Sequence, residues 1–167
     1  MTISSNVLWG ALALGLVTGM RSTLGPTLTS RALAARADIE TADEPAPTLA
    51  SHRAQQLLLP MAAGELLGDK MPFAPDRTIL PSMLVRALSA GLTGAALAGA
   101  RRESVWLPAL IGATAALVSS EVGLRLRKPY QHRTLTNAAL GLTEDCLALA
   151  LGTAGLQRAL GKDSGRR

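Results

Sequence analysis

The chain has 167 residues, of which 48% are hydrophobic and 17% are charged, against roughly 25% charged residues in an ordinary soluble domain. A single cysteine, Cys146, excludes a disulfide framework, and four aromatic residues (two Trp, one Tyr, one Phe) are too few for a stacking surface that binds nucleic acid. The net charge is +5, but the basic residues cluster between apolar runs, as membrane topology requires. We therefore expect a small all-α membrane protein with no nucleic-acid partner.

The first apolar segment covers about residues 6–35 and is too long to cross a bilayer as one straight helix. A helix of this length measures ~45 Å, whereas the hydrocarbon core is ~30 Å thick. Between Gly19 and Pro26, two glycines and the proline weaken the helix beside the charge of Arg21. We expect the helix to be broken or re-entrant there, with Arg21 facing protein. Because no basic residue precedes the segment, we expect a retained helix and not a signal peptide.

Four more apolar segments follow, which predicts a polytopic transmembrane helical bundle of about five spans in one domain, residues 1–167. Residues 36–53 carry acids and prolines and are expected to form a polar loop outside the membrane, while residues 161–167 form a basic tail. With five crossings, this loop, the turn at Arg101 and the C-terminus share one side of the membrane. The predicted second to fifth spans cover about residues 54–70, 81–100, 105–126 and 135–160.

Small residues repeat at four-residue spacing in three of the predicted spans. Such stripes let helix backbones approach closely in lipid, either within one chain or between two copies. We therefore expect close helix packing and a homo-oligomer, with a dimer favoured. The repeats are Gly15 and Gly19, then Gly64 and Gly68, then Gly91, Ala95 and Gly99.

Ionisable side chains within membrane spans are costly, so each one is a candidate for function. Arg21 lies at the expected break of the first segment. Glu65 and Asp69 are four residues apart, so both carboxylates face one side of the second span, and Lys70 follows directly. We expect these charges to bind an ion or a small charged solute. The candidate binding residues are Arg21, Glu65, Asp69, Lys70, Glu121, Glu144 and Asp145.

The later acidic residues differ in their spacing. Glu121 precedes Arg125 by four residues, which favours a helical ion pair. Glu144 and Asp145 are adjacent and diverge by ~100°, so only one of them can point fully into a bundle. We expect Arg21 to pair with a carboxylate, because an isolated intramembrane arginine costs at least ~2.5 kcal/mol. The expected partners are Glu65 or Asp69, or Glu121 or Glu144 if the helix order differs.

Two sequence motifs resemble those of a known family. Over roughly residues 6–125 the chain is similar to the bacterial membrane proteins catalogued as domain of unknown function 4126. The resemblance implies a multi-pass protein of the bacterial inner membrane, and it implies no particular activity. The motifs are GMRS at 19–22 with Pro26, and GELLGDKMP at 64–72 with Pro75 and Arg77.

Two classes of function remain open at this point. In the first, the protein is transporter-like or channel-like, and half-helix ends and carboxylates bind an ion or a solute. In the second, the same charges are structural ion pairs in a membrane scaffold or a lipid-interacting protein. We expect no enzyme, metal or cofactor, because His52 and His132 both lie in predicted loops and no catalytic triad, metal-ligand or phosphate-loop spacing occurs.

Overall fold

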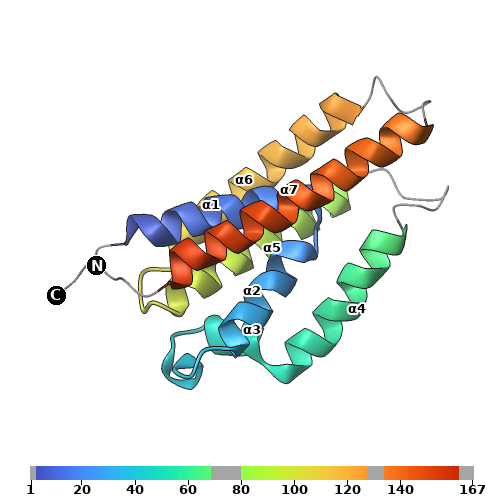
Figure 1. The fold of residues 1–167 in the computed structure, drawn as a ribbon. Helices are drawn as coiled ribbons and strands as arrows, with labels where there is room; N and C mark the ends of the chain where they lie inside the picture. Colours follow the sequence, from blue (N-terminus) through green and yellow to red (C-terminus); the bar gives the residue numbers. More distant parts are fainter. Residues whose placement is uncertain (1–2, 69–79, 128–133, 162–167) are drawn as a thin grey trace.

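The computed structural model describes residues 3–68, 80–127 and 134–161 (Figure 1). Within these ranges the chain forms seven α-helices and one 3-10 helix, and no strand, which confirms the predicted all-α class. The elements are α1 (Ser5–Met20), α2 (Leu24–Ala34), η1 (Ile39–Thr41), α3 (Ala46–Ala50), α4 (His52–Gly68), α5 (Leu80–Gly99), α6 (Trp106–Arg127) and α7 (Thr134–Leu160).

Two of the described helices are long and apolar enough to cross a membrane, namely Leu80–Gly99 and Trp106–Leu126. α1 is also apolar but has only 16 residues. α7 has 27 residues and continues without interruption through Glu144 and Asp145. A bundle of five spans is therefore not confirmed, whereas two helices of membrane-spanning length and composition are present.

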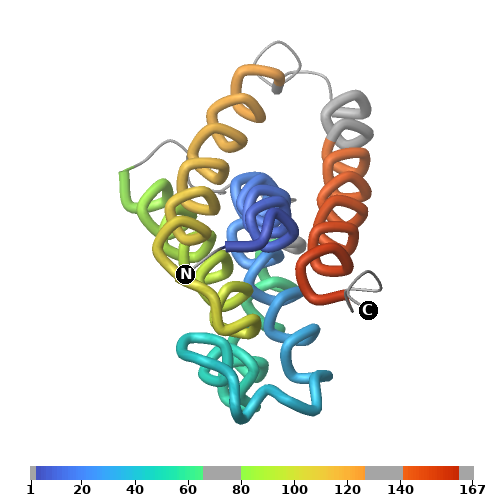
Figure 2. Tube along the Cα trace, turned by 90° about the vertical axis from the view of Figure 1, so that its left-hand side faces the viewer, coloured from blue at the N-terminus to red at the C-terminus, as the bar shows by residue number. Residues whose placement is uncertain are grey.

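α1 is the central helix and packs against α5, α6 and α7 (Figure 2). Its close approach to α6 requires glycine, because a Cβ atom on Gly15 would lie 2.5 Å from the carbonyl oxygen of Gly112. A Cβ atom on Gly19 would likewise overlap the carbonyl oxygen of Ala116. The predicted small-residue packing is thus confirmed in α1. Gly64 makes no such contact within the chain, because a Cβ atom there would meet no atom within 4 Å.

α1 and α2 form a hairpin whose two outer ends lie at the same end of the bundle (Figure 1). Just before α1, the Ser4 amide donates a 2.8 Å hydrogen bond to Glu103 in the turn between α5 and α6. Just after α2, Arg36 Nη1 donates to the carbonyl oxygen of Leu160 at the end of α7, at 3.3 Å. The hairpin therefore enters the bundle and returns, which agrees with the re-entrant form of the predicted break, and a first span that crosses from one side to the other is not confirmed.

The segment predicted as a polar loop, residues 36–53, is partly folded. It contains η1 and α3, and Ala46 and Leu49 of α3 are buried against Leu33 of α2 and Ala96 of α5. The Asp43 amide also donates to the carbonyl oxygen of Gly99 at 3.0 Å. Apolar residues scattered among the acids thus anchor this segment to the bundle.

α4 is the most peripheral of the long helices (Figure 1). It packs mainly against α2 and α3, and three of its large apolar side chains, Leu57, Leu59 and Met61, are exposed. Pro60 lies inside the helix without ending it. The contact that ties the far end of α4 to the bundle is made by Glu65, at the point where α1 and α2 meet.

Candidate functional site

The hairpin is broken at Arg21–Ser22–Thr23, within the interval where the interruption was predicted. α1 ends at Met20, and Pro26 lies in the first turn of α2, where its missing N–H removes no intrahelical hydrogen bond. Such a break leaves carbonyl groups unsatisfied at the end of one helix and N–H groups unsatisfied at the start of the next. The polar side chains of the surrounding helices converge on these two sets of groups.

Glu65 of α4 caps the start of α2. Its Oε1 accepts hydrogen bonds from the Ser22 amide at 2.7 Å and the Ser22 hydroxyl at 2.9 Å. Its Oε2 accepts from the Thr23 amide at 2.9 Å and the Thr23 hydroxyl at 2.6 Å. A negative charge at a helix N-terminus is also favoured by the helix dipole. One carboxylate therefore satisfies two backbone and two side-chain donors of the break.

The carbonyl groups at the end of α1 are capped from the opposite side. Gly19 O accepts from Arg86 Nη1 of α5 at 2.6 Å and from the Ser120 hydroxyl of α6 at 2.9 Å. One turn earlier, Leu16 O accepts from the Ser119 hydroxyl at 2.9 Å. Arg86, Ser119 and Ser120 are all buried. Side chains of other helices thus bind backbone groups at both ends of the break.

Arg21 occupies the break itself and faces protein, as predicted. Its Nε lies 2.7 Å from Asp145 Oδ1 of α7, and the two side chains are 6% and 26% exposed. Asp145 belongs to the predicted candidate residues, but it is not among the partners that were expected for Arg21. Because α7 runs straight past the break, it brings Asp145 to Arg21, while Glu65 is taken up by the start of α2.

The remaining candidates do not all join this group. Glu121 forms the predicted pair with Arg125, at 2.8 Å, but on the surface of α6, where the side chains are 47% and 75% exposed. Glu144 faces a mainly apolar crevice of about 340 Å³ between α1, α6 and α7. Asp69 and Lys70, like residues 162–167 of the predicted tail, lie outside the described residues. Among the described residues, no group of three or more His, Cys, Asp or Glu side chains is placed to hold a metal ion.

Sequence reasoning missed the residues that cap the end of α1. An arginine within an apolar helix indicates a polar site inside the bundle, and Arg86 is such a residue. Because Arg86 lies near the start of the third predicted span, it resembles a charge that flanks the membrane. Ser119 and Ser120 carry no comparable signal, because serine is common in helix interfaces. Ser22 and Thr23 were visible only as the residues that follow Arg21.

Comparison with known proteins found no matching family model, no significantly similar curated protein and no significantly similar solved structure. The resemblance to the family catalogued as domain of unknown function 4126 therefore stays a prediction.

Proposed function

We propose that the protein is a small multi-pass protein of the bacterial inner membrane, of the transporter or channel class, and that the break between α1 and α2 is its site for an ion or a small charged solute. One observation carries the proposal. Ionisable side chains from four separate parts of the chain meet around a single helix break: Arg21 at the break, Glu65 of α4, Arg86 of α5 and Asp145 of α7.

The fold supports this proposal in two ways. α5 and α6 have the length and apolar composition of membrane spans, and the broken hairpin lies against both of them. Irregular backbone is tolerated at membrane depth only where protein or water satisfies it, and at the break side chains bind the amides of Ser22 and Thr23 and the carbonyl oxygen of Gly19. Half-helix ends of this kind form the ion and substrate sites of many secondary transporters.

The balance of charge suggests how an ion would bind. Among the described residues, two guanidinium groups (Arg21 and Arg86) and two carboxylates (Glu65 and Asp145) lie at the break, and Arg21 and Asp145 form an ion pair. An ion that binds to Arg21 or to Asp145 would replace the other member of this pair, so binding would be coupled to a change in the contacts at the break. This pair is accessible to solvent, because the Asp145 side chain is 26% exposed.

A flux assay in proteoliposomes tests the proposal. The purified protein is screened with inorganic cations, protons, and small carboxylates and phosphates, beside the variants Asp145→Asn and Glu121→Gln. We expect flux in the parent protein, loss of flux in Asp145→Asn, and unchanged flux in Glu121→Gln, which removes a carboxylate of equal charge on the surface of α6. Absence of flux in the parent across the screen would contradict the proposal.

A membrane scaffold is the second candidate, and a specific observation favours it. The four hydrogen bonds to Glu65 use the roughly four acceptor positions of a carboxylate, so this group has no position left for a ligand. A scaffold predicts that Glu65→Gln lowers the midpoint of thermal unfolding in detergent while the parent protein shows no flux. A transporter predicts flux in the parent, whatever the stability of the variant.

A further inference from the structure

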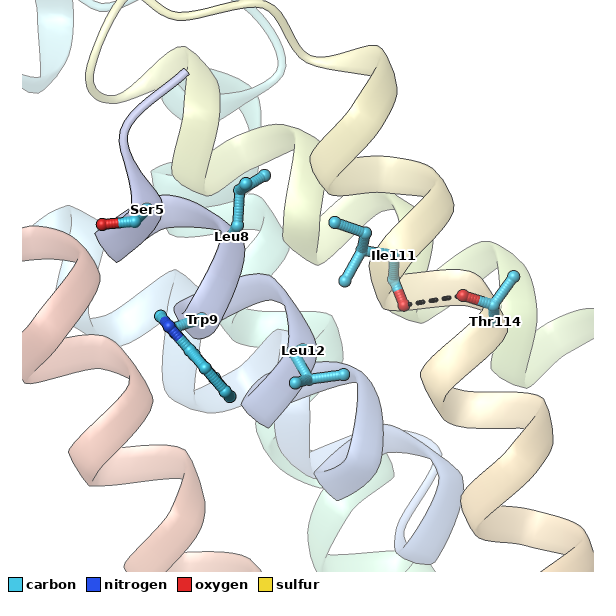
Figure 3. Close-up of a pocket in the computed structure, with 6 residues that line it drawn as sticks. All are labelled: Ser5, Leu8, Trp9, Leu12, Ile111 and Thr114. Carbon is cyan, nitrogen blue, oxygen red and sulfur yellow. Dashed lines mark hydrogen bonds between the residues drawn. The ribbon is translucent and has the colours of Figure 1, made fainter.

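Two hollows lie along α1, the first lined by residues of α1 and α6 and the second by residues of α1, α6 and α7; together they are called the groove. In Figure 2 α1 is seen along its axis with α6 on one side and α7 on the other, and α6 and α7 have little direct contact over the described residues. The part of the groove near the start of α1 is a hollow of about 460 Å³ (Figure 3), and a second hollow of about 340 Å³ follows at Leu16 and Met20. The first hollow is lined by Ser5, Leu8, Trp9, Leu12, Ile111 and Thr114.

The groove has a mainly apolar lining, with Glu144 at its second hollow. The α1 residues that line it recur every three or four positions from Ser5 to Met20, which corresponds to a length of ~22 Å along the helix. A helix ~10 Å wide and ~22 Å long would fill on the order of 1,700 Å³ and would stand mostly outside the two hollows. An extended acyl chain is much thinner and can lie within them.

A positively charged side chain, Arg158, lies beside the end of the groove near the start of α1. The guanidinium of Arg158 lies over the ring of Trp9, 5.8 Å from its centroid, and Nε donates to Asn6 Oδ1 at 3.4 Å. Arg158 belongs to α7, so this contact joins the start of α1 to the last turns of α7. Arg158 is exposed and forms no ion pair with a carboxylate of the described chain. Its charge is therefore available to an anionic group placed near the first turn of α1.

We propose that this groove binds one anionic phospholipid, with an acyl chain along Leu8 and Leu12 and the phosphate at the Arg158 guanidinium. Tryptophan and arginine are the residues that anchor proteins at the membrane interface, where an arginine binds phosphate and a tryptophan ring contacts the upper acyl chain. The inference rests on the proposed membrane location and is independent of transport at the helix break.

Bromine on lipid acyl chains quenches nearby tryptophan fluorescence, and the chain has only Trp9 and Trp106. The Trp106→Phe variant, with Trp9 as its only reporter, is placed in vesicles of equal amounts of phosphatidylglycerol and phosphatidylcholine. Bromine is carried by one lipid or by the other. We expect stronger quenching by brominated phosphatidylglycerol, corresponding to about a fivefold preference for the anionic lipid, the contribution of one basic residue near an anionic headgroup.

Three variants locate the preference. Adding Arg158→Gln should make the two lipids quench Trp9 equally, whereas Arg158→Lys, which keeps the charge, should retain the preference. Arg102→Gln removes an exposed charge from the turn between α5 and α6, and it should leave the preference unchanged. The Arg158→Lys result keeps the test valid if Arg158→Gln does not fold.

The alternatives give different results. Equal quenching by both lipids in Trp106→Phe would overturn the proposal. An equal loss of the preference for phosphatidylglycerol in the Arg102 and Arg158 variants would also overturn it, because it would show only a diffuse attraction between the basic protein and the anionic lipid. Trp106 is 77% exposed, and in the Trp9→Phe variant it is the only tryptophan. If brominated lipid quenches Trp106 in that variant but does not quench Trp9 in Trp106→Phe, then protein covers the groove, as a second copy would. That result would also overturn it.

Discussion

Two arginine–carboxylate pairs have nearly equal distances between their charged atoms but differ in burial and in the backbone around them. Arg21 lies 2.7 Å from Asp145, and Arg125 lies 2.8 Å from Glu121. The first pair joins two helices at the break of the hairpin, and the Arg21 side chain is 6% exposed. The second lies along one helix, and its arginine is 75% exposed. The comparison shows that burial and the neighbouring backbone, not the distance between charges, distinguish a pair that holds the fold together.

The largest effect is expected from removing the buried charge. Arg21→Met should lower the free energy of unfolding by about 3 kcal/mol, because it leaves Asp145 uncompensated in a partly buried site. The matched variant Arg125→Met should change it by at most about 0.5 kcal/mol, since exposed pairs contribute little. Unfolding curves in detergent with denaturant measure both. If both variants lose the same free energy of unfolding, the two pairs contribute equally to stability and the proposed difference between them is wrong.

Glycine packing gives a second, smaller contrast. Gly15→Ala should destabilise the protein by about 1–3 kcal/mol, because the added methyl group meets the backbone of Gly112. Gly64→Ala should leave stability unchanged or raise it by up to about 1 kcal/mol, since its surroundings are open and alanine favours helix. The same unfolding curves provide the measurement. A stable Gly15→Ala variant would show that α1 and α6 are not in close contact.

The smallest effect concerns an exposed pair outside the bundle. The hydrogen bond from Arg36 lowers the pKa of Asp38 below its ordinary value, and the bond lengths are 2.7 and 2.9 Å. The contribution to stability is therefore complete above the ordinary pKa, near ~4, and is lost as the pH falls through the lowered value. In NMR titrations, Arg36→Gln should raise the pKa of Asp38, and Arg31→Gln should leave it unchanged. An unchanged pKa in Arg36→Gln would exclude the pair in solution.

The break and the burial of Arg21 could be predicted from local sequence. Glycine and proline weaken a helix wherever it packs, and a charge in an apolar segment needs protein around it. The partner of Arg21 could not be predicted in the same way. It depends on which helix passes the break, and Asp145 and Glu144 have the same local signal.

The sequence pattern also could not determine whether the first apolar segment crosses the bundle or returns. The length of the first apolar segment is compatible with a tilted span or with a return, and the choice depends on contacts such as those of Leu33 with Ala46 and Ala96. The contacts of Glu65 likewise could not be predicted from the sequence pattern. Its spacing from Asp69 indicates a shared helix face, but not that the carboxylate meets the two N–H groups of Ser22 and Thr23.

Amide hydrogen exchange at Ser22 and Thr23 tests most directly the claim that side chains of other helices hold the break. Both amides lie outside regular helix, yet each donates to the Glu65 carboxylate, at 2.7 and 2.9 Å. We expect both to exchange slowly in the parent protein and in Glu121→Gln. In Glu65→Gln they should exchange much faster, because an amide group has only one acceptor oxygen for the two backbone N–H groups. Fast exchange at both amides in the parent protein, or equal exchange in the parent and Glu65→Gln, would contradict the account.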